Sequence, residues 1–157
     1  MPKQSAHAGA YLILTAQFNA LVTERLAAGA RDVLLRAGVD AGRIEEAGVS
    51  GAWELPPAAM AAARSGRYAA IVACGAVIRG ETPHFDHVCR ASVDGLARVQ
   101  LDTQVPVGLA VLTTDTLEQA LNRAGGKGGN KGGEAAMAAM EAAAVITRLA
   151  EGGPARL

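Results

Sequence analysis

The chain has 157 residues, of which 50% are hydrophobic and 3% aromatic, and its 15 basic and 15 acidic side chains leave no net charge. This size and apolar content predict a single domain over residues 1–157 with a substantial core. The balanced charge argues against broad electrostatic binding to nucleic acid or to an anionic membrane, the scarce aromatic rings argue against base stacking, and no apolar run approaches the roughly 20 residues of a membrane span.

Strand and helix patterns alternate from the N-terminus onward. The apolar run at 10–15 predicts a buried strand, and apolar residues at helical spacing over 21–37 predict a helix. Residues 43–49 are more polar and predict a strand nearer an edge of the sheet. An alanine-rich stretch over 54–65, with two prolines near its start and a glycine after its end, predicts the next helix.

The second half of the chain continues this alternation. Residues 69–78 are apolar throughout, which is typical of a central parallel strand. Residues 83–101 predict a helix, and residues 106–112 predict a fourth strand. A further helix is expected to end at residue 123, with Thr114 or Asp115 as its N-cap.

A glycine-rich stretch, residues 125–133, separates that helix from a last predicted helix over 134–149. It does not match a phosphate-binding P-loop, because the residues flanking its second lysine are wrong for that motif and a helix rather than a strand precedes it. We interpret it as a flexible connector. Closure over an anionic ligand stays open as an alternative, because three cations surround the stretch: Arg123, Lys127 and Lys131.

The order of elements predicts a three-layer α/β sandwich of the flavodoxin-like kind, in which a four-stranded parallel sheet has helices on both faces. Ligands of such folds bind beyond the carboxyl ends of the strands. The segments 17–19, 51–54 and 80–84, together with the loop after Leu112, are expected to lie there. The chain ends, residues 1–9 and 151–157, are expected to be flexible; residues 1–9 lack the apolar core of a signal peptide.

The segment 75–88 carries the strongest chemical signal. A predicted buried strand ends at a glycine and turns directly into a helix, with Thr82 expected as the N-cap and Pro83 as the first helical residue. Free backbone N–H groups and the helix dipole predict an anion site there. His84 in the first turn is a candidate acid–base group or a plain surface residue, whereas His87 is expected to face solvent or a neighbouring subunit.

Other side chains at the predicted strand ends have two interpretations each. Glu54 is either a partner of a helix dipole or an acceptor of hydrogen bonds from ligand hydroxyls. Phe18 either fills the core or stacks on a planar ring. Cys74 is expected to be an inert core residue. Neither Cys74 nor Cys89 has metal-ligand partners at useful spacing, so the sequence predicts no metal site and no disulfide framework. These features favour a protein located in the reducing cytoplasm.

Taken together, these residues resemble the lumazine synthase family over residues 10–149. The resemblance depends on five groups of residues in combination: Phe18-Asn19, residues 51–56 (GAWELP), residues 77–86 (VIRGETPHFD), residues 112–125 with LTT and EQALNRAG, and residues 129–136 with GNKG and EAA. It implies condensation of 5-amino-6-(D-ribitylamino)uracil with 3,4-dihydroxy-2-butanone 4-phosphate to 6,7-dimethyl-8-ribityllumazine, with loss of phosphate and water. It also implies that neither a metal nor an organic cofactor takes part.

The resemblance implies a role for each matching residue. Phe18 would stack on the pyrimidine ring, and Glu54 would accept hydrogen bonds from the ribityl hydroxyls. His84 would be the proton shuttle. Ala52 and Trp53 would contact the ribityl chain, and the backbone of Ala76, Val77 and Ile78 would contact the ring edge. The backbone N–H groups of Glu81 and Thr82 would bind the phosphate together with Arg123. Lys131 would contact the ring or the phosphate.

The resemblance further implies a site between neighbouring subunits of a pentamer, with Leu109, Arg123 and Lys131 supplied by the adjacent chain. Leu109 stands where many members of the family carry Phe, and Glu81 where a small or neutral residue is common. The short segment between Arg123 and Lys131 is similar to that of members whose pentamers assemble into an icosahedral shell. The sequence therefore predicts a homo-oligomer and favours the shell.

Two other functions stay open. One is a phosphosugar-processing α/β enzyme that uses the same anion site and His84. The other is a non-catalytic flavodoxin-like module that binds a flavin or a lumazine without turnover.

Overall fold

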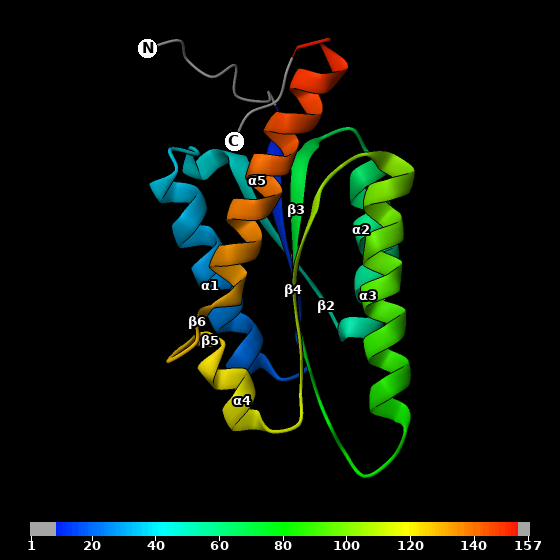
Figure 1. The fold of residues 1–157 in the computed structure, drawn as a ribbon. Helices are drawn as coiled ribbons and strands as arrows, with labels where there is room; N and C mark the ends of the chain where they lie inside the picture. The colour runs from blue at the N-terminus through cyan, green and yellow to red at the C-terminus, as the bar shows by residue number, and fades with distance from the viewer. Residues whose placement is uncertain (1–8, 154–157) are drawn as a thin grey trace.

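A parallel sheet with strand order β2-β1-β3-β4 lies at the centre of the computed structural model, which describes residues 9–153 (Figure 1). Its strands are β1 (Ala10–Ala16), β2 (Ile44–Val49), β3 (Tyr68–Ile78) and β4 (Val107–Thr114). All three neighbouring pairs are parallel, and β2 and β4 form the edges. The predicted four-stranded parallel sheet is confirmed. The expected flexibility of residues 1–9 and 151–157 concerns mostly residues outside the described range and stays a prediction.

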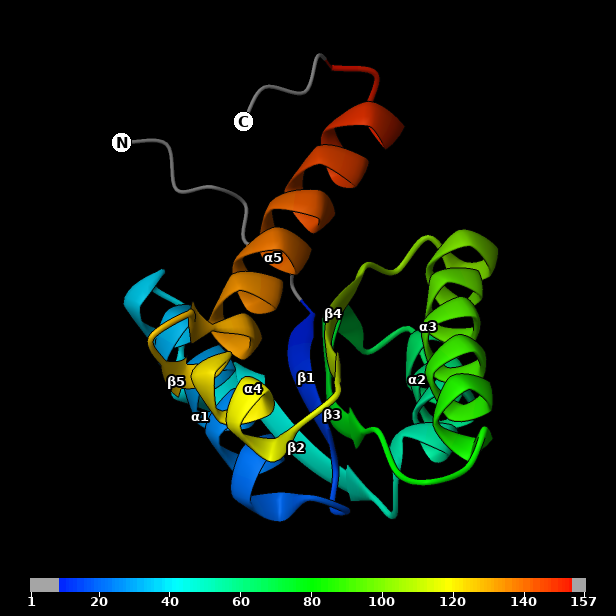
Figure 2. The same cartoon turned by 60° about the horizontal axis from the view of Figure 1, so that its bottom comes forward.

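Two helical layers cover the sheet (Figures 1 and 2). Helices α1 (Ala20–Arg36) and α5 (Lys131–Ala150) pack on one face, and α2 (Leu55–Arg64) and α3 (His84–Thr103) pack on the other. Successive strand residues point to opposite faces, so the strands contribute alternately to two cores. Ile13 and Val72 belong to the core beneath α1, whereas Leu12 and Ile71 belong to the core beneath α2. The three-layer α/β sandwich is therefore confirmed.

Several connections between the strands and helices differ from the predictions. Helix α4 (Leu117–Asn122) is capped by Thr116, whose side chain accepts a hydrogen bond from the Gln119 N–H at 3.1 Å. The predicted caps, Thr114 and Asp115, were wrong because β4 continues through Thr114. The two short 3-10 helices, η1 (Ala41–Arg43) and η2 (Ala52–Glu54), lie before β2 and α2.

Helix α3 begins one residue later than predicted. Pro83 has helical backbone angles (φ −63°, ψ −5°) but occupies the N-cap position, and no side chain caps the helix. Thr82 is therefore not the N-cap, and its hydroxyl makes no hydrogen bond within residues 9–153. Within the described residues, the N–H groups of His84 and Phe85 at the start of this helix donate to no acceptor, whereas those of Asp86 and His87 donate to the Pro83 carbonyl.

The glycine-rich stretch is not a flexible connector. It folds into an antiparallel hairpin, β5 (Ala124–Gly126) and β6 (Gly129–Asn130), which leads directly into α5. The Asn130 side chain caps α5 by accepting hydrogen bonds from the N–H groups of Gly132 (2.9 Å) and Gly133 (3.2 Å). This cap starts the helix three residues before the predicted start.

Glycines let α1 and α5 approach each other closely. A Cβ at Gly132 would collide with the backbone carbonyl of Leu26, and a Cβ at Gly29 would collide with the Asn130 side chain. The Asn130 Nδ2 also donates to the Arg25 carbonyl at 3.0 Å. The motif that superficially resembles a phosphate loop is therefore a helix-packing motif, and it fixes the start of α5.

We predict that Gly132→Ala destabilises the fold, because the added methyl group meets backbone that no rotamer change can move. The expected loss is at least about 1–3 kcal/mol in the free energy of unfolding, measured by denaturant or thermal unfolding. Gly42→Ala is the matched control, since a Cβ there meets no atom within 4 Å. Equal stability of the two variants would contradict the packing account.

Candidate functional site

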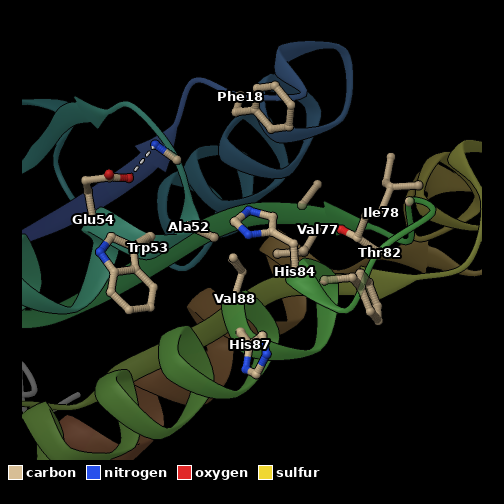
Figure 3. Close-up of a pocket in the computed structure, with 14 residues that line it drawn as sticks. Phe18, Ala52, Trp53, Glu54, Val77, Ile78, Thr82, His84, His87 and Val88 are labelled. Atoms are coloured by element: carbon tan, nitrogen blue, oxygen red, sulfur yellow. Dashed lines mark hydrogen bonds between the residues drawn. The ribbon is translucent and has the colours of Figure 1, made fainter.

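A cavity of about 690 Å³ opens where β1, β2 and β3 end, beside the start of α3. We call it the ring cavity. Side chains and backbone from the segments after these three strands line it, and Figure 3 shows them arranged around the His84 imidazole. It gathers nine of the predicted site residues: Phe18, Ala52, Trp53, Glu54, Ala76, Val77, Ile78, Thr82 and His84. Its place beyond the carboxyl ends of the strands is the one expected for this fold class.

Hydrogen bonds connect the strand-end loops that build the ring cavity. The Phe18 N–H donates to the Ser50 carbonyl at 2.9 Å. The Asn19 side chain donates to the Ala76 carbonyl at 2.9 Å, and Asn19 has the left-handed conformation (φ 63°) that Asn tolerates. This backbone holds the Phe18 ring away from the core, and the residue is 72% exposed. Phe18 is therefore not a core plug.

Glu54 makes a local hydrogen bond that neither of its two interpretations named. Its Oε2 accepts a hydrogen bond from the Gly51 N–H at 3.0 Å at the start of η2, which is the half of a capping box that a glycine N-cap permits (Figure 3). Its Oε1 has no partner within the described residues. The neighbouring Trp53 is 60% exposed. One carboxylate oxygen and a large aromatic face thus remain available to a ligand.

The turn between β3 and α3, residues 79–83, presents free donors. Within the described part of the chain, the backbone N–H groups of Gly80, Glu81 and Thr82 donate to no acceptor. The whole turn is exposed and lies at the positive end of the α3 dipole. This arrangement fits the predicted anion site. The Glu81 side chain lines neither cavity described in this section.

Two histidines line the ring cavity, not one. His84 and His87 lie one turn apart on α3 and are both exposed, with Val88 beside them (Figure 3). The exposure of His87 agrees with the expectation that it faces solvent, and its place in the cavity lining adds a second imidazole at the rim.

A second cavity of about 570 Å³ runs along the outer edge of β4, between α3 and α4. We call it the cation cavity. Leu109, Arg123 and Lys131 line it, so the structure does not bring these three predicted residues together with the nine others within one chain. Phe85 lines both cavities and lies at their boundary.

Local hydrogen bonds fix the basic residues of the cation cavity. The Arg123 Nη1 donates to the Gln119 carbonyl at 2.9 Å, and the Arg123 carbonyl accepts from the Lys131 N–H at 2.8 Å. Lys131 also forms an ion pair with Glu134 at 2.8 Å. The hairpin therefore places both cations side by side at the rim of β4.

Other groups give no sign of a further site. Cys74 is fully buried, and burial raises the pKa of its thiol to about 12, so it stays protonated and unreactive at neutral pH. Cys89 is partly buried, and burial raises its pKa as well. Residues 9–153 contain no cluster of three or more His, Cys, Asp or Glu side chains suited to a metal ion. None of the described helices combines the length and apolarity needed to cross a membrane.

Comparison with known proteins connects this geometry to one family. A family model described as 6,7-dimethyl-8-ribityllumazine synthase matches residues 9–147. The chain is 49% identical over 139 residues to the 6,7-dimethyl-8-ribityllumazine synthase of Salinibacter ruber, covering 88% of this chain and 89% of that protein. It is also 49% identical over 137 residues to the protein of the same name from Desulfatibacillum aliphaticivorans, covering 87% and 88%.

Proposed function

This chain belongs to the 6,7-dimethyl-8-ribityllumazine synthase family, and we propose that its reaction takes place where the ring cavity of one protomer meets the cation cavity of another. The enzyme is a transferase of riboflavin biosynthesis. It condenses 5-amino-6-(D-ribitylamino)uracil with 3,4-dihydroxy-2-butanone 4-phosphate to 6,7-dimethyl-8-ribityllumazine, phosphate and water. The family match disfavours both a non-catalytic flavin-binding module and an unrelated phosphosugar enzyme.

The observation that carries the proposed site is the separation of two complementary sets of groups. The ring cavity has aromatic faces, a free carboxylate oxygen, histidines and unbonded N–H groups, but no described Lys or Arg lines it. The cation cavity has Arg79, Arg123 and Lys131 but no histidine. A phosphorylated ketone and a ribityl-substituted uracil require both sets. Two copies of the chain that face each other through these cavities supply them.

The ring cavity would bind the uracil substrate. Phe18 would stack on the pyrimidine, since its ring is exposed and its backbone is fixed. The Oε1 of Glu54 would accept from the ribityl hydroxyls, with Ala52 and Trp53 along the same chain. The backbone of Ala76, Val77 and Ile78 would contact the ring edge, since these residues line the cavity wall. Leu109 of the neighbour would close the pocket with an aliphatic surface.

The 79–83 turn would bind the phosphate group. Its unbonded N–H groups at Glu81 and Thr82 match the acceptor oxygens of a phosphate. Arg123 and Lys131 of the neighbouring protomer would add positive charge from the opposite side. The Glu81 carboxylate, which lines neither cavity, would point away from the anion.

The reaction consists of acid–base and elimination steps. The amine of the uracil attacks the ketone and one water leaves to give an imine. A proton is then removed, phosphate leaves, and the ring closes with loss of a second water. His84 lines the cavity that holds the reacting atoms and would move the protons between them. None of these steps requires a metal or an organic cofactor, and we propose none.

We also propose that the protein forms pentamers, which assemble into an icosahedral shell, and that it works in the cytoplasm. Exposed apolar side chains at both cavities, Phe18 and Leu109 among them, support burial against another copy. The tight hairpin between Arg123 and Lys131 has no insertion that would obstruct a shell. The two free cysteines suit a reducing compartment.

One assay tests the function directly. Purified protein is mixed with both substrates, and lumazine absorbance and phosphate release are followed together. The proposal expects both signals. Binding of the uracil without phosphate release would support the non-catalytic module, and turnover of another phosphosugar without uracil binding would support the alternative enzyme.

We predict that His84→Ala lowers kcat by about 10²–10⁴-fold without abolishing turnover. Residual activity is expected because orientation of the two substrates contributes up to roughly 7–11 kcal/mol independently of proton transfer. His87→Ala, which alters the other imidazole of the cavity, is expected to cause a smaller loss. Activity of His84→Ala within twofold of the unmodified enzyme would exclude His84 as the shuttle.

We predict that Arg123→Ala raises KM for the butanone phosphate. Loss of one charge-assisted hydrogen bond costs about 1.5–3 kcal/mol, which corresponds to roughly ten- to a hundredfold. Lys127→Ala is the matched control, because Lys127 lies in the same hairpin and is exposed but lines neither cavity. An unchanged KM in Arg123→Ala, or an equal change in the control, would refute the phosphate role.

We predict that light scattering of the purified protein gives the mass of a shell of pentamers. A mass near that of a single pentamer would overturn the shell and leave the shared site intact. A monomer that turns over both substrates would overturn the shared site as well.

A further inference from the structure

The 79–83 turn has little backbone support of its own. The Arg79 N–H donates to the Thr114 carbonyl at 2.9 Å, and at its other end the Asp86 N–H donates to the Pro83 carbonyl at 3.0 Å. Between these points, no backbone hydrogen bond within the described residues holds the turn. Gly80 has no atoms packed where a side chain would lie. A turn that must aim its N–H groups at a phosphate therefore needs support from side chains.

The Arg79 guanidinium supplies contacts on three sides. Its Nε donates to Asp115 Oδ1 at 2.8 Å, its Nη1 lies 3.7 Å from Asp86 Oδ1, and its carbon lies 4.4 Å from the centroid of the Phe85 ring. Phe85 is only 8% exposed, so it is fixed in the fold. Arg79 thus connects the end of β3, the first turn of α3 and the loop after β4. Arg79 and Asp115 also line the cation cavity, and the guanidinium is engaged there by two carboxylates and the Phe85 ring.

The hydrogen bonds of Asp115 extend the Arg79 contacts toward Arg123. The Asp115 N–H donates to Gln119 Oε1 at 2.8 Å, and the Gln119 carbonyl accepts from Arg123. Each protomer is proposed to contribute to two phosphate sites: the 79–83 turn to one, and Arg123 to the site it shares with a neighbour. This continuous set of contacts links the two contributions.

The expected sizes of these effects indicate that Arg79 matters more for substrate binding and turnover than for the stability of the fold. The Arg79 side chain is 49% exposed and that of Asp115 is 64% exposed, and ion pairs between exposed side chains contribute little to stability. A misplacement of about 1 Å in a group that positions a substrate can cost roughly 10²-fold in rate. Loss of Arg79 should therefore affect phosphate binding more than folding.

We propose that Arg79 is a positioning residue for the phosphate-binding turn, acting through its contacts with Phe85, Asp86 and Asp115 and not by contact with the substrate. The proposal depends on the proposed function for the identity of the anion. This role requires a planar guanidinium group that stacks on the Phe85 ring while it forms ion pairs with two carboxylates, so lysine cannot replace arginine here.

The test compares Arg79→Met, Arg79→Lys and Asp115→Asn with the unmodified enzyme, by steady-state kinetics for each substrate and by thermal unfolding. Arg79→Met is expected to raise KM for the butanone phosphate at least about tenfold, to leave KM for the uracil within twofold, and to shift the melting temperature by less than about 4 °C. Arg79→Lys is expected to show the same defect. Arg90→Met is the matched control, since Arg90 is exposed on α3 and lines neither cavity.

The double variant Arg79→Met/Asp115→Asn separates positioning from direct contact with phosphate. The proposal expects a smaller KM rise in Asp115→Asn and no further rise when it is combined with Arg79→Met, because both changes break the same bridge. Recovery of normal KM in Arg79→Lys would indicate direct attraction of the phosphate and overturn the proposal. An unchanged KM in Arg79→Met, or an equal rise for both substrates with a large loss of thermal stability, would also overturn it.

Calorimetric binding of inorganic phosphate provides a readout that does not depend on turnover. The unmodified protein is expected to bind phosphate more tightly than Arg79→Met, by the same factor as the KM change. If the unmodified protein makes no lumazine, the proposed function fails while this comparison still tests Arg79. Equal phosphate affinity of the two proteins would refute the positioning role.

Discussion

The start of α3 separates two cavities with complementary chemistry, and this separation is the constraint on which the proposed site depends. Phe85 lies at the boundary and lines both cavities, while histidines and free N–H groups lie on one side and Arg123 and Lys131 lie on the other. Within one protomer the two groups of residues line separate cavities. Under the proposed function, each active site combines the ring cavity of one copy with the cation cavity of another, so association of copies is part of the proposed mechanism.

The rigid scaffold gives each half of the site its geometry. Close packing of α1 against α5, which is possible only because glycines face the contact, fixes the hairpin that carries the two cations. On the other side, hydrogen bonds from Phe18 to Ser50 and from Asn19 to Ala76 connect three strand ends. Side chains proposed to bind substrate, such as Trp53, remain exposed because these connections hold the backbone in place and leave the side chains without core partners. This combination favours catalysis by orientation, with proton transfer as a smaller contribution.

The sequence predicted the strands well because fully apolar runs such as 69–78 have few alternatives in an α/β protein. It predicted helix starts poorly, because a cap depends on backbone angles that a composition pattern does not encode; Thr116 and Asn130 are the caps, and Thr82 is not. The glycines of 125–133 indicated flexibility, whereas tertiary contacts with α1 make Gly132 and Gly133 a packing surface. The division of site residues between two cavities follows from tertiary structure, so only the family resemblance pointed to it.

Complementation between two defective variants is the most direct measurement of the shared site. Differently tagged His84→Ala and Arg123→Ala chains are co-expressed, and mixed assemblies that carry both tags are assayed at a low concentration of butanone phosphate. A site built from two protomers predicts that the mixed assemblies exceed the activity of either parent assembly, because some interfaces then pair an intact His84 with an intact Arg123. Mixed assemblies that never exceed the more active parent would show that each chain holds its own complete site, contrary to this account.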